Sequence, residues 1–340
     1  MINTTVKAAA TLVLALAGTW GGAASASGDD DADPMVAGIA LIAPVPSLEL
    51  ARDGFVDVAT ECPGVDIEVV ERNAEGDLAS LQSIIEGFVG EGVDFINPIS
   101  TPAAQAAYQV VGAAGGTIPV AYSGVTDPFG SGLAEDPATH DDWITGSQSL
   151  PPFAAVVDAI EALVPDAQVI GLPYTPSEAN SQPVIDAFQA IVDERGLTLE
   201  TAVADESSDV GAATQALVAA GAEVIVVPTI TTIDTGQAAI VQVAQDNGIP
   251  VVGSAAAQAQ AGAAVAVGAD YYGAGARAGE IACAVLSGEA TPADFDVINI
   301  EQPAIQVNEE AAAAQGVTIP ESLLAAAAPT SSDAPATTGG

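Results

Sequence analysis

Polar residues that could bind a charged small molecule are concentrated in the loop Pro173–Pro183, which contains Tyr174, Glu178, Asn180 and Ser181. A short apolar run before the loop predicts a buried strand, and apolar residues at helical spacing after it predict a helix. Asn180 or Ser181 can cap that helix, whose free N–H groups favour an anionic group such as a carboxylate. Tyr174 adds an aromatic face, so the chemistry indicated is recognition of a small molecule.

Single hydroxyl side chains recur where other predicted strands end, at Ser47, Thr101, Ser123, Thr229, Thr231 and Thr232. Each is by itself typical of an ordinary helix cap, and Thr235 or Asp234 could cap the helix after the last three. The carboxyl ends of parallel strands lie at one edge of a sheet, and ligands bind there. The recurrence therefore favours a binding rim that runs along this edge.

Catalytic signatures are weak in comparison. His140 is the sole histidine, it lies in a polar loop, and no Ser or Cys in a recognisable nucleophile elbow accompanies it. There is no Walker loop, so any ATPase must be another protein. The many Asp and Glu residues leave a metal site open, although no ligand spacing stands out. We expect a binding protein with no cofactor rather than an enzyme.

The elements that position these residues alternate between short apolar strands and amphipathic helices, as in doubly wound parallel α/β sheets. A length of 340 residues suits two such lobes. We expect a first lobe at 36–122 plus 254–300 and a second at 123–253 plus 301–328. The irregular stretch after residue 122 is interpreted as the crossing into the second lobe. The Ser-, Thr- and Pro-rich tail 329–340 predicts disorder.

The charge is extreme: 45 Asp and Glu against 5 Lys and Arg, a net charge of −40. Nucleic-acid binding needs the opposite sign, and anionic membrane surfaces would also repel this chain. A surface this acidic is screened by high ionic strength. We therefore hypothesise a marine or salt-loving, halophilic source.

The N-terminus predicts export. Residues 1–26 contain the apolar run Ala8–Ala17, too short to span a membrane, and end in the cleavage site Ala24-Ser25-Ala26. An acidic linker, 27–35, follows. Thr19 stands where a lipoprotein would carry its lipidated Cys. The sequence thus predicts a soluble periplasmic or extracellular protein without a lipid anchor.

Two cysteines are present, Cys62 and Cys283. Outside the cell they can pair, whereas two buried free thiols are the equally typical alternative. We expect both to lie in the first lobe, because the late strand and helix recross to it.

Several strings of residues resemble one family in order along the chain. The chain is similar to the exported substrate-binding proteins of ABC importers, in the branch for aromatic amino acids such as tryptophan or tyrosine. The strings are Arg72–Asp77, Ser100–Gln105, Gly124–Pro128, Ile144–Gly146, Tyr174–Ser181, Gly268–Tyr271 and Asn308–Glu321.

The resemblance implies the type I periplasmic-binding fold, in which two Rossmann-like lobes are joined by three crossings. By position, it implies a second-lobe side of the site formed by Tyr174, Glu178, Asn180, Ser181, Thr231 and Thr232. It implies a first-lobe or hinge side formed by Ser47, Thr101, Thr126 and Asp127. Asp270, followed by Tyr271, would take the amino group of an amino-acid ligand, because an ammonium needs a carboxylate partner.

The function so implied is capture of a small molecule, favouring an aromatic amino acid, by hinge closure between the lobes. The protein would act as a monomer and deliver its ligand to a permease with a separate ATPase. The fold also binds sugars, nucleosides and other ligands, so these remain alternatives. A ligand sensor or an enzyme is the less favoured interpretation.

Overall fold

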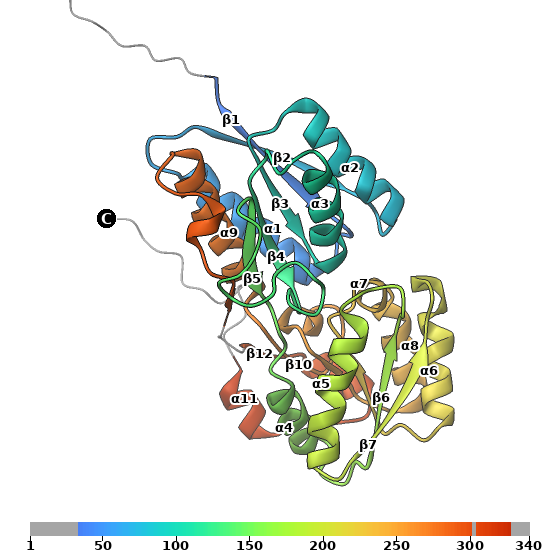
Figure 1. Ribbon diagram of the computed structural model, residues 1–340. Coiled ribbons are helices and arrows are strands. Elements are labelled where there is room, and N and C mark those ends of the chain that lie inside the picture. The colour runs from blue at the N-terminus through green and yellow to red at the C-terminus, as the bar shows by residue number, and fades with distance from the viewer. Residues whose placement is uncertain (1–32, 301–303, 328–340) are drawn as a thin grey trace, which may run out of the picture. The chain divides into compact units, whose positions relative to one another are not determined.

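The chain forms two lobes, each built on a six-stranded sheet with helices on both faces (Figure 1). The computed structural model describes residues 33–300 and 304–327. The predicted signal peptide 1–26, most of the linker 27–35 and the tail 329–340 lie outside these ranges. Among the described residues, no helix is long and apolar enough to cross a membrane.

The first lobe has the strand order β11-β5-β4-β3-β1-β2, with all neighbours parallel. Helices α2 and α3 cover one face of this sheet, and α1 and α9 cover the other (Figure 1). The strands are β1 Met35–Leu41, β2 Ile67–Asn73, β3 Phe95–Ile99, β4 Val120–Val125, β5 Ile144–Gln148 and β11 Ile298–Asn299. The helices are α1 Pro46–Thr60, α2 Leu78–Glu91, α3 Thr101–Ala113 and α9 Tyr271–Leu286, with a short 3-10 turn, η3, at Pro292–Asp294.

The second lobe has the order β12-β10-β9-β8-β6-β7, in which only β12 runs antiparallel, against β10. Its strands are β6 Val169–Tyr174, β7 Thr198–Val203, β8 Val224–Val227, β9 Val251–Gly253, β10 Val265–Gly268 and β12 Ala304–Val307. Its helices are α4 Phe153–Leu163, α5 Ser181–Glu194, α6 Val210–Ala219, α7 Thr231–Thr235, α8 Gln237–Asn247, α10 Glu309–Ala314 and α11 Glu321–Ala326, with 3-10 turns η1 Ser207–Asp209 and η2 Ala256–Ala259. The predicted doubly wound α/β class is therefore correct, with one antiparallel edge strand in addition.

Each lobe has its own apolar core, which holds the strand ends in place. In the first lobe Phe55 stacks on Phe95 with ring centroids 6.2 Å apart, and both are fully buried. In the second lobe Phe153 meets Phe188 edge to face at 5.7 Å, on the side of the sheet covered by α4 and α5. A second cluster fills the side covered by α6 and α8. Buried on both faces, the central strands are continuous apolar runs, as parallel strands are.

The sheets divide the chain differently from the predicted boundaries. β5 pairs with β4 in the first sheet, so the chain crosses only after residue 148, not at 123. β10 pairs with β9 in the second sheet, so the return crossing follows residue 268, not 253. The sequence pattern did not predict β5, which lies in the stretch interpreted as the crossing. Sheet membership depends on long-range hydrogen bonding that periodicity does not contain. The third crossing joins β11 to β12.

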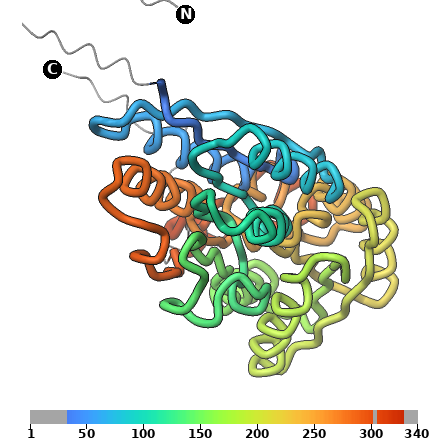
Figure 2. Tube along the Cα trace, turned by 45° about the horizontal axis from the view of Figure 1, so that its top comes forward, coloured from blue at the N-terminus to red at the C-terminus, as the bar shows by residue number. Residues whose placement is uncertain are grey.

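Helices α1 and α9 pack with their backbones in contact (Figure 2). A Cβ at Gly275 would collide with the carbonyl oxygen of Ala51, so only glycine allows this approach. Cys62, just after α1, forms a disulfide with Cys283 of α9, with a Cα–Cα distance of 5.6 Å. Because both helices begin at the pocket described next, their packing determines where its first-lobe side chains lie.

Candidate functional site

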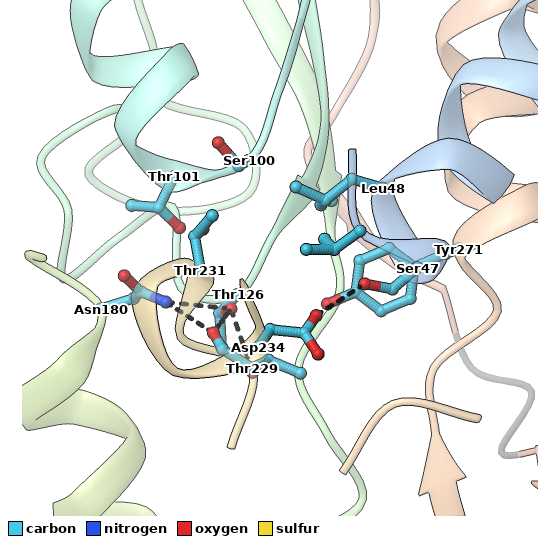
Figure 3. A pocket seen from close by; sticks show the side chains of 12 residues that line it. Ser47, Leu48, Ser100, Thr101, Thr126, Asn180, Thr229, Thr231, Asp234 and Tyr271 are labelled. Carbon is cyan, nitrogen blue, oxygen red and sulfur yellow. Dashed lines mark hydrogen bonds between the residues drawn. The ribbon is translucent and has the colours of Figure 1, made fainter. Parts of the chain in front are cut away.

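A pocket lies where the carboxyl ends of strands from both lobes meet (Figure 3). Its cavity volume is about 20 Å³, which is room for about one water molecule. The first lobe contributes Val45, Ser47, Leu48, Ser100, Thr101, Gly124, Thr126 and Tyr271, and the second Asn180, Thr229, Thr231 and Asp234. A ligand much larger than water can therefore enter only if the pocket residues of the two lobes move apart.

On the first-lobe side, the pocket faces the N-terminus of α3. Ser100, not the predicted Thr101, is the cap: its Oγ accepts from the Ala103 N–H at 3.3 Å, and its φ is 106°. This leaves the Thr101 hydroxyl, on a residue 2% exposed, without any hydrogen-bond partner. Pro102 has no N–H and the Ala103 N–H is bonded to Ser100, so the partial positive charge of this helix N-terminus is offered through the Thr101 N–H. This wall suits an anionic group that can also bond the Thr101 hydroxyl.

On the second-lobe side, Asn180 precedes α5 but does not cap it through its side chain, in contrast to the prediction. Its Nδ2 instead donates to the Thr229 carbonyl oxygen at 2.8 Å. Its Oδ1 is buried and has no partner. An unpaired buried acceptor is costly, so this atom is ready to bind a donor brought by a ligand.

Asp234, on α7, is the ionisable group of the pocket that the sequence analysis did not select. Its Oδ2 accepts from Ser47 Oγ of the other lobe at 3.1 Å, and its Oδ1 accepts from Gln258 Nε2 at 3.1 Å. Burial raises the pKa of Asp234 to about 6, hydrogen bonds from Gln258 and Ser47 oppose the rise, and the charge of Glu178 adds to it. The one sequence feature that could have selected Asp234 as a site residue is that it is the only acid between Thr229 and Thr235.

The apolar part of the pocket comes from Val45, Leu48 and the ring of Tyr271. Tyr271 is 5% exposed, and burial together with the nearby Asp234 charge raises its pKa. The phenol therefore stays neutral at physiological pH. The pocket thus combines polar groups of two kinds with an aromatic and aliphatic wall.

Glu178 does not line the pocket but bonds the start of α7, which does. Its two carboxylate oxygens accept from the backbone N–H groups of Thr231 at 2.9 Å and Thr232 at 2.7 Å, at the start of α7. A carboxylate at a helix N-terminus is stabilising. These two hydrogen bonds hold the short helix α7, which carries Asp234, in place. Glu178 and Thr232 face an adjoining acidic groove of about 360 Å³, which meets the pocket at Thr231.

Six of the twelve predicted site residues do not line the pocket. Glu178 and Thr232 line only the groove, and four residues line neither: Asp127, Asp270, Tyr174 and Ser181. The Asp127 carboxylate accepts from the N–H groups of Phe129 and Gly130 within its own turn. Asp270 caps α9 by accepting from the Gly273 N–H at 2.9 Å. The sequence cannot distinguish such local capping from ligand binding, because both use the same residue types at helix starts.

The predicted residues that the structure does bring together at the pocket are Ser47, Thr101, Thr126, Asn180, Thr231 and Tyr271. Thr126 lies 3.4 Å from Thr229 through their hydroxyls, which links the lobes beside Asn180. Among residues 33–300 and 304–327, no group of three or more His, Cys, Asp or Glu side chains could hold a metal ion.

A family model and several known proteins are similar to this chain over most of its length. The family model of the ABC transporter substrate binding protein matches residues 36–331. A tyrosine-binding protein of Clostridioides difficile (strain R20291) is 31% identical over 276 residues, covering 80% of this chain and 78% of that protein.

Two solved structures superpose closely, each with a TM-score of 0.80 over 86% of this chain and 98% of the other. One is a domain in complex with L-Trp from Streptococcus pneumonia, 29% identical. The other is a conserved domain protein from Vibrio cholerae, 30% identical. With two α/β lobes and three crossings, the fold is the type I periplasmic-binding fold. ABC transporter substrate-binding proteins bind their ligands and do not catalyse, and they work outside the cytoplasm. Because the family model covers nearly all of the described residues, this chain belongs to the ABC transporter substrate-binding protein family.

Proposed function

We propose that the protein captures a free aromatic amino acid between its lobes and delivers it to an ABC permease. The observation that carries this proposal is that one pocket holds two kinds of polar group. The α3 N-terminus and the Thr101 hydroxyl suit a carboxylate, whereas the Asp234 carboxylate and Asn180 Oδ1 are acceptors that suit an ammonium. A zwitterionic α-amino acid carries both groups.

The side chain of the ligand would lie against Tyr271, Leu48 and Val45. Aromatic pairs add stabilisation beyond their buried area. The relatives support an aromatic ligand, since one is a tyrosine-binding protein and another was solved with L-Trp.

Binding would proceed by separation and closure of the lobes. The contacts Ser47–Asp234 and Thr126–Thr229 join the two lobes directly across the pocket. They must part for an amino acid to reach the pocket, and each has polar atoms that can bond the ligand when the lobes close again. The permease would then recognise the closed form.

Isothermal titration calorimetry of the protein in high salt tests the proposal. We expect binding of L-tryptophan, L-tyrosine or L-phenylalanine. Two analogues of tryptophan separate the polar contacts: tryptamine lacks the carboxylate and indole-3-propionate lacks the ammonium. Each should bind at least tenfold more weakly, because a buried charged partner would be left unpaired.

Leucine, a sugar and a nucleoside serve as controls. Tight binding of a sugar or nucleoside, without binding of any aromatic amino acid, would refute the proposed ligand class. Equal affinity for tryptophan and indole-3-propionate would refute the role given to the acceptors Asp234 and Asn180.

A further inference from the structure

Gln258 is a buried glutamine on η2, 2% exposed, that does not line the pocket. Its Oε1 accepts from the Ala255 backbone N–H at 3.0 Å, and its Nε2 donates to Asp234 Oδ1 at 3.1 Å. A backbone N–H can bond only the oxygen of the amide, so the nitrogen must face Asp234. The orientation of the amide is thus determined by the backbone.

The turn that carries Gln258 is itself held in place. The Gln258 carbonyl oxygen accepts from Gln237 Nε2 at 2.7 Å and from the Ala263 N–H at 3.0 Å. The side chain also packs against Gly253, where a Cβ would lie 2.6 Å from Gln258 Oε1. Gln258 therefore connects the turn between β9 and β10 to Asp234 on α7 with little freedom to move.

Asp234 depends on this donor. Among the ion pairs of the described residues, none includes Asp234, and within the second lobe its one side-chain hydrogen bond is from Gln258. The titratable groups that act on Asp234 are Glu178, from the loop before α5, and Tyr271, from α9. The Glu178 charge disfavours ionisation of Asp234, as does burial. Gln258 and Ser47 oppose these effects, and Ser47 belongs to the other lobe.

We propose that Gln258 is a positioning residue of the ligand site, which holds the Asp234 carboxylate ionised and aimed at the pocket so that the site selects ligands with a protonated amino group. The ligand part of this inference rests on the proposed function. The Gln258–Asp234 contact itself does not, because both residues lie in the second lobe and meet without any ligand.

The variant Gln258→Glu separates the two roles of the amide. Its carboxylate can still accept from the Ala255 N–H, but it has no N–H to donate to Asp234. We expect the pKa of Asp234 in the ligand-free protein, followed by carboxyl NMR, to rise by about one unit or more, because the donor is lost and the new carboxylate repels a charge on Asp234. We expect the affinity for L-tryptophan at pH 7 to fall about tenfold or more, as for loss of a hydrogen bond to a charged group. The pH below which L-tryptophan binding weakens should rise with the Asp234 pKa.

The matched control is Gln315→Glu. Gln315 is also fully buried, with Oε1 accepting from the Val251 N–H and Nε2 donating to the Gly262 carbonyl oxygen, both at 2.8 Å. It lies at the opposite end of β9 from the pocket. This variant should lower the melting temperature but leave the Asp234 pKa and the pH profile of binding unchanged.

A second variant, Gln258→Met, removes the donor without adding a charge and keeps the test valid if Gln258→Glu does not fold. An unchanged Asp234 pKa in either folded Gln258 variant would overturn the inference, as would an equal change in Gln315→Glu. Failure of wild-type protein to bind L-tryptophan would instead count against the proposed ligand, because the NMR measurement needs no ligand.

Discussion

Replacing Asp234 by Asn is expected to stabilise the ligand-free protein at pH 7 and, at the same time, to weaken amino-acid binding. Asn keeps the shape of the side chain. Its Oδ1 can accept from Gln258 and its Nδ2 can donate to the Ser47 hydroxyl, so the two hydrogen bonds of Asp234 are retained. What disappears is a carboxylate that burial makes costly to ionise.

The size of the effect follows from the pKa. Asp234 has a pKa of about 6 in the folded protein, against 3.8 as the unperturbed value. A rise of this size corresponds to about 3 kcal/mol of destabilisation once the group is ionised in both states. Because the folded pKa is the higher one, the folded protein binds the proton more tightly. The stabilisation by the proton is complete below the unfolded pKa and is lost as the pH rises through 6.

Urea unfolding of ligand-free wild type and Asp234→Asn at pH 4 and pH 7, in constant high salt, measures this effect. Asn should exceed wild type by about 3 kcal/mol at pH 7, and the difference should shrink toward zero at pH 4, where Asp234 is protonated. Calorimetry with L-tryptophan should show the opposite order at pH 7. Such a conflict between stability and function is common at binding sites.

Asp270→Asn is the matched control, since Asp270 is the acid that the sequence analysis selected for the ligand's amino group. It caps α9 by accepting from the Gly273 N–H, and Asn caps a helix as well as Asp does. We expect little change in stability or affinity. If Asp234→Asn is less stable than wild type at pH 7, or if its advantage is the same at pH 4, the burial argument is wrong. If Asp270→Asn loses amino-acid binding and Asp234→Asn does not, Asp270 and not Asp234 binds the amino group of the ligand.

Four further predictions concern the pocket wall, the helix packing and the charge. Thr101→Val removes a buried hydroxyl that has no hydrogen-bond partner, so the stability of the ligand-free protein should be unchanged or higher. Calorimetry should show weaker amino-acid binding, and an unchanged affinity would exclude contact between the ligand and this hydroxyl. Replacing Cys62 and Cys283 by Ala opens a loop of 221 residues and should cost about 2–5 kcal/mol in urea unfolding; no loss would mean that the α1–α9 packing suffices. Gly275→Ala forces its Cβ against the Ala51 carbonyl oxygen, so the free energy of unfolding should fall by about 3 kcal/mol, and a neutral effect would contradict the close packing. With a net charge of −40, the melting temperature should rise as NaCl increases from about 0.01 to 1 M and the Debye length shortens, whereas indifference to salt would refute the halophilic interpretation.

The fold was largely predictable because parallel strands in an α/β sheet leave a strong local signal. Two examples are the strand Val224–Val227, which is a continuous apolar run, and the helix Gln237–Asn247, whose buried residues Ile240, Val243 and Ala244 recur at helical spacing. The prediction is wrong for β5, which lies in the stretch interpreted as the crossing, and for β10, which was expected in the first lobe. The strand patterns of the two lobes are alike, so nothing local in Val265–Gly268 tells which sheet it joins.

The candidate site was predictable in its location but not in all of its members. Hydroxyl residues at strand ends indicated the edge at which the pocket lies, and Ser47, Thr101 and Asn180 line that pocket. Asp270 and Asp127 did not differ from them in sequence, yet their carboxylates bond backbone N–H groups of their own turns. Whether a polar side chain caps a turn or faces a ligand depends on its rotamer and neighbours, which spacing does not specify.

The sequence by itself determined the class of protein: two α/β lobes, an acidic surface, and polar residues at the strand ends without catalytic machinery. These properties follow from composition and short-range periodicity, which are local. Only the tertiary structure selected Asp234 and Gln258, since they contact each other across 24 residues and Asp234 also contacts Ser47, 187 residues away. Burial at that junction also raises the Asp234 pKa, and burial is a property of the packed lobes, not of the residue.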